Sequence, residues 1–165
     1  MYSMKYSIIL VLMLNAFTYA QHKVYAVTPD QLVFKIESSN KPSIVQFWVP
    51  NCENNIEIVE GYKNLMENYG NAINFYFIGI TNKEELVEEL MAKTNYQFDF
   101  YIIDKSVSPE NLYLRKETFN RTFTEIISAK KKDFVTGYFG RKNVSFFLTR
   151  SIKIRKSKIR QLIQN

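Results

Sequence analysis

Two continuous apolar segments restrict the possible folds of this chain more than any other feature. They are SIVQFWV at residues 43–49 and INFYFIGI at residues 73–80. Each is bounded by turn-forming residues and has the length of a strand buried on both faces. Between them Ile56, Val59 and Met66 recur at helical spacing. A strand, an amphipathic helix over about residues 53–69 and a second strand predict a right-handed crossover between adjacent parallel strands. The three apolar residues should cover one face of the sheet.

The same alternation continues on both sides of this unit. A strand is expected at residues 23–27, followed by a helix with Thr28 as N-cap, Pro29 in the first turn and Gln31 closing a capping box. Asn82 is expected to cap a further helix. The remaining predicted elements are strands at 98–104, 143–149 and 151–155, helices at 83–94 and 108–129, and a short helix at the end of the chain. Together they predict one three-layer α/β domain with a central mixed sheet flanked by helices.

The amino-terminal residues are typical of an export signal. Lys5 is followed by SIILVLML, an apolar stretch that is short for a membrane span, and NAFTYA then ends at Ala20 with a small-residue cleavage pattern. We therefore expect a signal peptide at residues 1–20 and a single domain at residues 21–165, in an extracytoplasmic, oxidising compartment, periplasmic or secreted. An uncleaved membrane anchor is the alternative. With one cysteine, the chain has no internal disulfide.

Positive charge is concentrated near the carboxyl terminus. From Lys130 onward the chain has eleven Lys or Arg residues and a single acid, Asp133. The final stretch contains no aromatic residue, which argues against single-stranded nucleic acid as a partner. A solvated basic face is the simplest interpretation. An anionic membrane surface or partner is the alternative, and it would be contacted through Lys153, Arg155, Lys156, Lys158 and Arg160.

The segment VQFWVPNCENNIEI, residues 45–58, resembles the signature of thioredoxin-like proteins, especially the exported TlpA/ResA-type thiol-disulfide oxidoreductases. Those proteins have a Phe-Trp strand end followed by Cys-x-x-Cys at the start of a long helix. The expected order of elements from about residue 24 to 165 also fits that fold, although residues 105–140 form a longer region that fits poorly. The resemblance implies a thioredoxin-like three-layer fold and a redox site at the turn after the strand.

The resemblance places the family's attacking cysteine on Cys52 and its resolving cysteine on Asn55. A dithiol reductase is released from its mixed disulfide when the second thiol attacks, and an asparagine side chain cannot perform that step. The Gly-Pro pair between the cysteines corresponds to Glu53 and Asn54. The motif is therefore degenerate, Cys-Glu-Asn-Asn.

Three further positions of the family's site also differ here. The aromatic residue before the first cysteine corresponds to Asn51, and a buried acid that some members carry in the strand corresponds to Gln46. The cis-proline that faces the site corresponds to Asn143. Cys52 is the one marker of redox chemistry that this chain retains, either as a reactive thiol or as a small buried filler of the core.

Three functional interpretations follow. The first is a redox-degenerate module that binds a protein or peptide at a surface made of Trp48, Pro50, Asn51, Glu53, Asn55 and Asn143. The second is a monothiol thiol-disulfide exchange enzyme that uses Cys52. The third is a protein that binds anionic surfaces through its basic carboxyl terminus. No cofactor and no metal are expected, because the single histidine, His22, offers no His/Cys cluster and no glycine-rich phosphate loop is present.

Overall fold

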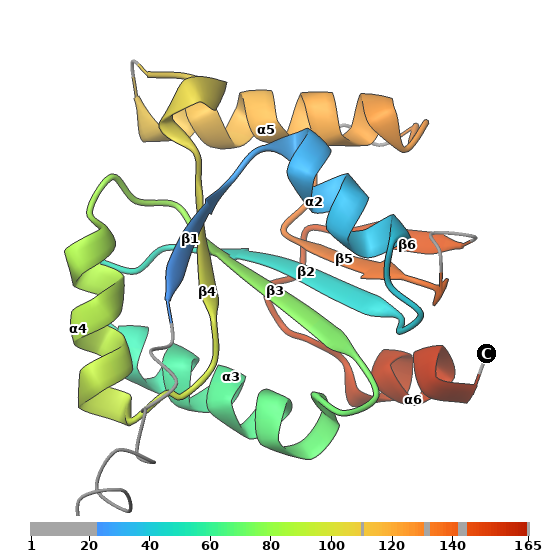
Figure 1. Ribbon diagram of the computed structural model, residues 1–165, viewed down its shortest axis with the longest axis horizontal. Coiled ribbons are helices and arrows are strands. Elements are labelled where there is room, and N and C mark those ends of the chain that lie inside the picture. The colour runs from blue at the N-terminus through green and yellow to red at the C-terminus, as the bar shows by residue number, and fades with distance from the viewer. Residues whose placement is uncertain (1–22, 110, 131–132, 142–144, 165) are drawn as a thin grey trace, which may run out of the picture.

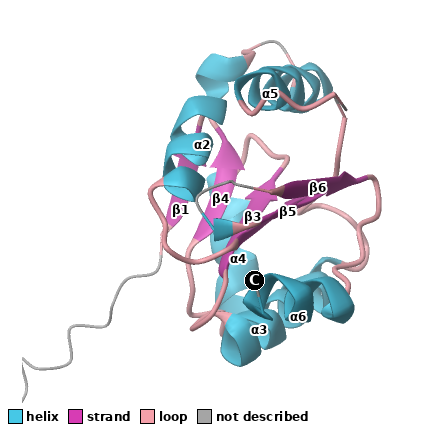
Figure 2. Cartoon of the chain, turned by 90° about the vertical axis from the view of Figure 1, so that its right-hand side faces the viewer, coloured by secondary structure: helices cyan, strands magenta, loops and turns pink. Residues whose placement is uncertain are grey.

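The computed structural model describes residues 23–109, 111–130, 133–141 and 145–164, so the expected signal peptide lies outside the described residues. In this part of the chain a six-stranded mixed sheet separates two helical layers (Figures 1 and 2). The expected three-layer α/β architecture is confirmed. The strands are β1 (Val24–Val27), β2 (Ser43–Trp48), β3 (Asn74–Gly79), β4 (Phe100–Ile103), β5 (Thr136–Phe139) and β6 (Phe146–Thr149). The helices are α2 (Pro29–Glu37), α3 (Asn55–Tyr69), α4 (Glu84–Thr94), the 3-10 turn η1 (Lys105–Val107), α5 (Leu112–Ile126) and α6 (Lys156–Gln164).

The strand order is β1-β4-β3-β2-β5-β6, and the first four of these strands are parallel. β5 and β6 complete the sheet in antiparallel orientation. Strand β2 lies beside β3 with Ile44 opposite Phe75 and Phe47 opposite Ile78. The predicted pair of adjacent parallel strands is therefore confirmed, although Val49 lies beyond the end of β2 and is exposed.

Alternation along β2 divides the core into two layers. Ile44 and Trp48 pack on the side of α3, α4 and α6, whereas Val45 and Phe47 pack on the side of α2 and α5. This division follows from the opposite orientation of successive side chains in a strand. Aromatic rings fill both layers, and the stack of Tyr62 on Phe77, with ring centroids 3.8 Å apart, lies at the centre of the first.

The start of α2 is as the sequence predicts. The Thr28 side chain accepts a hydrogen bond from the Gln31 backbone, and the Gln31 side chain accepts one from the Thr28 backbone, so that the capping box is complete. Leu32, Val33 and Ile36 are buried on the inner face of this helix.

The predicted cap of α4 is wrong. Lys83, not Asn82, is the N-cap residue, and its side chain makes no capping hydrogen bond. Asn82 Oδ1 instead accepts a hydrogen bond from Arg115, a guanidinium that is only 2% exposed. A buried cation without hydrogen-bond acceptors destabilises the fold far more than an uncapped helix end that water can solvate. The Asn82 oxygen therefore pairs with Arg115 and does not cap the helix.

The carboxyl-terminal third differs most from the prediction. Helix α5 begins at Leu112 with Asn111 as its cap, rather than at Ser108. Residues 151–155 are not a strand, and the antiparallel partner of β6 is β5, which the sequence analysis did not predict. The reason lies in the backbone hydrogen bonds of this segment, which go to side chains of the sheet. The Ser151 carbonyl accepts from Thr136 Oγ1 at 2.7 Å, and the Arg155 amide donates to Tyr138 at 3.0 Å.

Helix α3 begins two residues later than expected and buries a narrower face. Val59 and Tyr62 are buried and Met66 is partly buried against the core. Ile56, however, is 41% exposed, so its predicted place in the core is wrong. It lies in the first helical turn, close to the end of the sheet.

Candidate functional site

Cys52 lies in the turn between β2 and α3. Its amide donates to the Val49 carbonyl at 3.3 Å, and its own carbonyl accepts from the Asn55 amide at 3.2 Å. The thiol is free and the residue is half-buried. The residue is not fully closed off as a core filler would be, and it precedes a fifteen-residue helix.

Asn55, the first residue of α3, uses its side chain to close the same turn. Its Nδ2 donates to the Pro50 carbonyl at 3.0 Å in a partly buried contact. At the position that the resemblance assigns to a second thiol, this chain therefore has a side-chain amide. Its hydrogen bond joins the end of β2 to the start of α3.

A cavity of about 630 Å³ adjoins this turn at the carboxyl end of β2. Strand β2 lies between the parallel and the antiparallel halves of the sheet. The lining is mostly apolar and comes from several elements. Its residues are Gln46, Phe47, Trp48, Val49, Cys52, Glu57, Ile58, Gly61, Tyr62, Leu65, Ile80, Tyr113, Lys116, Val135, Ile152 and Ile154.

Two buried side chains of β2 contribute polar atoms to this lining. Gln46 is 3% exposed and Trp48 is 5% exposed. Gln46 Nε2 donates to the Ile152 carbonyl. Within the described residues, Gln46 Oε1 and Trp48 Nε1 have no hydrogen-bond partner.

Tyr62 forms part of the same wall. Its ring meets Trp48 edge-on with centroids 5.7 Å apart. Burial raises the pKa of the Tyr62 hydroxyl well above its usual range, and the nearby Cys52 adds to the shift. The wall is therefore poorly hydrated and disfavours charge.

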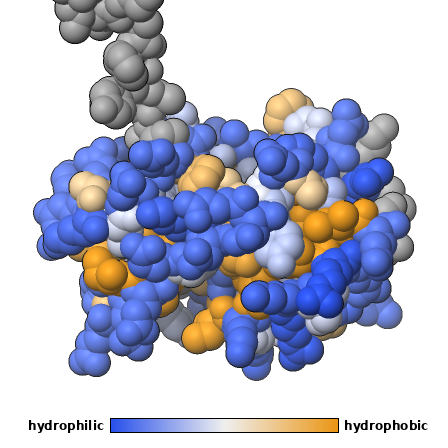
Figure 3. Space-filling view, turned by 90° about the horizontal axis from the view of Figure 1, so that it is seen from below, coloured by the Kyte–Doolittle hydropathy of each residue, from blue (hydrophilic) through white to orange (hydrophobic). Residues whose placement is uncertain are grey.

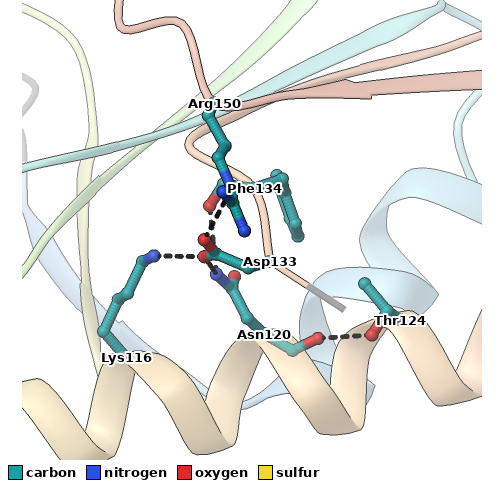
Figure 4. A network of polar contacts seen from close by, with 6 residues as sticks. All are labelled: Lys116, Asn120, Thr124, Asp133, Phe134 and Arg150. Atoms are coloured by element: carbon teal, nitrogen blue, oxygen red, sulfur yellow. Dashed lines mark hydrogen bonds and ion pairs between the residues drawn. The ribbon is translucent and has the colours of Figure 1, made fainter. Parts of the chain in front are cut away.

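Lys116, a cation in the lining, is neutralised by a polar network (Figure 4). Its Nζ lies 2.7 Å from Asp133 Oδ1, and Arg150 Nε lies 3.2 Å from Asp133 Oδ2. Asn120 donates to Asp133 at 3.1 Å and to the Phe134 carbonyl at 3.0 Å, while Thr124 donates to the Asn120 carbonyl. The hydrogen bond from Lys116 is the main reason that the pKa of Asp133 is held below its usual value. The network joins α5 to the ends of β5 and β6.

The structure brings together only part of the predicted binding surface. Trp48 is buried and lines the cavity, and Pro50 is buried beneath the turn. Asn51 and Glu53 are exposed on the turn around Cys52. Asn143 lies outside the described residues. The cavity itself was not predicted, because Tyr113, Ile152 and Ile154 reach it only through the tertiary fold.

The basic carboxyl-terminal residues are mostly exposed. Lys153, Arg155, Lys156 and Arg160 are exposed, and no ion pair joins them to an acid anywhere in the described chain. Lys158 is half-buried with its Nζ 4.9 Å from the centre of the Phe147 ring. Seen from below, strongly hydrophilic side chains gather at the right, where α6 lies, beside exposed apolar atoms (Figure 3).

No group of three or more His, Cys, Asp or Glu side chains in the described residues could hold a metal ion. None of the described helices has the length and apolarity needed to cross a membrane.

No protein-family model matches this chain, and no curated protein matches it. Among solved structures, it is similar to a thioredoxin-like protein in its oxidised form, with 14% identity, coverage of 84% of both chains and a TM-score of 0.48. A secreted disulfide oxidoreductase of Mycobacterium tuberculosis, described as homologous to DsbE of E. coli, is 13% identical over 76% of this chain and 82% of that chain, with a TM-score of 0.45. A thiol-disulfide oxidoreductase of Bacteroides fragilis is 13% identical over 76% and 80% of the two chains, with a TM-score of 0.45.

Proposed function

We propose that this chain is an extracytoplasmic thioredoxin-like protein that binds a protein or peptide partner at the Cys52 turn and has no internal dithiol cycle. The observation that carries the proposal is the hydrogen bond from Asn55 to Pro50. This hydrogen bond stabilises the turn at the position where the sequence resemblance implies a resolving thiol. Asn51 and Glu53 expose polar side chains around a half-buried Cys52, which suits contact with a partner.

The chemistry of exchange supports the absence of turnover. A Cys52 thiolate that attacks a partner disulfide forms one new S–S bond, breaks the old one and releases one half as a thiolate. With a single cysteine in the chain, the mixed disulfide then persists until an external thiol attacks it. The extracytoplasmic location rests on the expected signal peptide.

The test is reduction of insulin by dithiothreitol. We expect the purified protein to give the same rate as dithiothreitol alone, and the same rate as its Cys52→Ser variant. Reduction clearly faster than both controls would contradict the proposal. Titration of Cys52 with a thiol reagent, in the native and the unfolded protein, measures its accessibility separately.

A monothiol exchange enzyme is the second candidate, favoured by the position of Cys52 in a cavity wall. In that case an external thiol releases the partner in each cycle. The discriminating measurement is turnover of a glutathionylated peptide in excess glutathione. Turnover that Cys52→Ser abolishes would favour this enzyme over the binding module.

We also propose that the exposed bases of the carboxyl-terminal region contact an anionic surface. Lys153, Arg155, Lys156 and Arg160 support this, because within the described chain no acid neutralises them.

A further inference from the structure

Two adjacent phenylalanines are exposed on β6, the outermost strand at one edge of the sheet (Figure 1). Phe146 is 40% exposed and Phe147 is 44% exposed. Because successive side chains of a strand point to opposite faces, the two rings lie on different sides of the sheet. The ring centroid of Phe147 is 6.1 Å from that of Tyr138, on the side of α6. That of Phe146 is 6.3 Å from Phe139, on the side of α2 and α5.

Basic residues of the carboxyl-terminal segment lie beside Phe147. The Nζ of Lys158 is 4.9 Å from the centre of its ring. Arg155 is close as well, because its amide donates at 3.0 Å to the hydroxyl of Tyr138, whose ring neighbours Phe147. Neither base forms an ion pair with any acid that the structure describes. Residues 134–165 contain eight Lys or Arg residues and no Asp or Glu, so an apolar ring lies within a strongly positive segment.

Helix α6 extends the positive charge away from the ring. Lys156 and Arg160 are exposed one helical turn apart. Ile163, a further turn along the same row, is 38% exposed. In the view from below, strongly hydrophilic side chains in the region of α6 border exposed apolar ones (Figure 3). Positive and apolar side chains are therefore neighbours on this surface.

The two kinds of side chain together indicate which anionic surface fits. Positive charge alone suits any polyanion, but a polyanion dissolved in water offers an exposed phenyl ring no apolar phase to enter. A bilayer with anionic lipids provides both, since its phosphate groups lie directly above hydrocarbon. Lys and Arg side chains can keep their charge among the phosphates while aromatic rings beside them enter the boundary of the apolar layer.

An acidic protein is the competing partner. A protein interface depends on complementary shape, and its anchoring side chains fill pockets. Phe146 and Phe147 are anchors at the edge of a sheet, and neither lines the cavity beside Cys52. A fluid bilayer adapts to rings in such a position and requires no recess around them. The arrangement therefore favours the bilayer.

We propose that Phe146 and Phe147, together with Arg155, Lys158 and the exposed bases of α6, bind a bilayer that contains anionic phospholipid, and that the phenyl rings enter its apolar layer. This inference rests on the anionic surface proposed above and states what that surface is. Cys52 takes no part in this contact.

The first measurement is sedimentation of the purified protein with vesicles at low and at physiological salt. Vesicles of phosphatidylcholine are compared with vesicles in which part of this lipid is replaced by phosphatidylglycerol. We expect binding to the mixed vesicles at both salt concentrations, because salt screens the charges but does not weaken the burial of the rings. Phosphatidylcholine alone should bind little protein.

The second measurement reports insertion directly. Ser145→Cys in a Cys52→Ser chain provides a single thiol next to Phe146 for an NBD label, and vesicles with brominated acyl chains quench a label that enters them. Tyr25→Cys in the same chain is the matched control, because Tyr25 is 42% exposed on β1, the outermost strand at the opposite edge. We expect quenching at position 145 to be several-fold stronger than at position 25. Both phenyl rings remain in the labelled protein.

Substitution of one ring separates insertion from charge. Phe147→Ser should weaken binding to the mixed vesicles at physiological salt by about 3- to 10-fold, as the loss of one partly buried phenyl ring predicts. Its affinity for heparin, a polyanion without an apolar phase, should be that of the native protein. Tyr25→Ser should leave both affinities unchanged.

Three results would overturn the inference. These are sedimentation without quenching at position 145, equal quenching at positions 145 and 25, or equal affinity of Phe147→Ser and the native protein for the mixed vesicles. Each would leave an acidic protein or a soluble polyanion as the partner of the bases. Absence of sedimentation even at low salt would overturn the anionic surface as well. The insulin and thiol assays at Cys52 are independent of all these outcomes.

Discussion

Asn55 shows how one residue can preserve a turn while excluding a reaction. The family that this segment resembles has a second thiol at the position of Asn55. Here the Asn55 side-chain amide donates to the Pro50 carbonyl, so the turn between β2 and α3 is held closed without a disulfide. Cys52 lies three residues earlier, with its carbonyl bonded to the Asn55 amide. The side chains at these two positions start from one short turn.

Replacement of Asn55 by cysteine should therefore allow an intramolecular disulfide. In Asn55→Cys the two sulfur atoms belong to the first and last residues of one turn, which is closed by the hydrogen bond from the residue 55 amide to the Cys52 carbonyl, and this separation should be within disulfide reach. We expect mild oxidation to remove two hydrogens, measured by mass, and to protect both thiols from alkylation. Glu60→Cys, further along α3, is the control and should keep both thiols free. Free thiols in oxidised Asn55→Cys would show that residues 52–55 lack the geometry of a redox turn. Insulin reduction should stay slow, because Gln46 and Asn51 remain.

The charge of Asp133 should contribute to the stability of the fold. Its pKa is lowered mainly by the hydrogen bond from Lys116, so the folded state binds its proton less readily than the unfolded state. The contribution is present above the unfolded-state pKa of about 3.9 and is lost as the pH falls through the folded-state value.

Asp133→Asn should accordingly lower the free energy of unfolding by about 0.5–1 kcal/mol near pH 7, a value limited by the partial exposure of the pair. The difference between the two proteins should be smaller at about pH 3, because the unfolded state is then largely protonated, and it should vanish only below the lowered folded-state pKa of Asp133. Urea unfolding of the two proteins near pH 7 and at about pH 3 measures this difference in the free energy of unfolding. A difference that stays constant with pH would mean that the carboxylate charge is not the cause.

At the scale of elements, α6 combines one buried apolar residue with exposed basic residues beside it. Ile159 is fully buried against the layer that contains α3 and α4, while Lys156 and Arg160 are exposed. Ile159 anchors the helix to the core, and the exposed bases are the ones that would contact the anionic surface proposed above.

Reversing two charges of α6 should weaken such binding. Lys156→Glu combined with Arg160→Glu should weaken sedimentation with vesicles of anionic phospholipid at low salt, since each base contributes about 1 kcal/mol near such a surface. The matched control is Lys105→Glu with Arg121→Glu, which makes the same change of charge on η1 and α5. Equal loss in both double variants would indicate a general charge effect, and no loss in either would reject the basic face as the site.

The whole molecule depends on an aromatic layer under α3. Phe77 is fully buried, stacks on Tyr62 and has its ring centroid 6.3 Å from that of Phe100. Phe77→Ala should lower the free energy of unfolding by about 3–5 kcal/mol, because the cavity that remains cannot close. Phe34→Ala is the control, since Phe34 is 72% exposed, and it should change stability by less than about 0.5 kcal/mol. Denaturant unfolding compares them, and similar losses would contradict the layered core described above.

The elements that the sequence predicted correctly are those specified by neighbouring residues. The apolar runs of β2 and β3 and the capping box at Thr28 depend on local spacing and on short-range hydrogen bonds. The position of Cys52 before a helix follows for the same reason. Strand β5 was missed because its four residues carry no distinctive pattern, and their burial comes from β2 and β6 on either side.

The sequence by itself therefore determined the alternating α/β layout, the start of α2 and the turn that carries the single thiol, since contacts between near neighbours in the chain specify them. Only the tertiary structure decided the rest. It assigned Asn82 to a buried arginine instead of a helix cap, left Ile56 exposed and tied residues 151–155 to the sheet. It also formed the cavity beside Cys52 from α3, α5 and the segments around β5 and β6. These outcomes depend on which residues that are distant in the sequence come into contact in the folded core, and on which buried polar atoms must then find hydrogen-bond partners. The spacing of residues along the chain predicts neither of these.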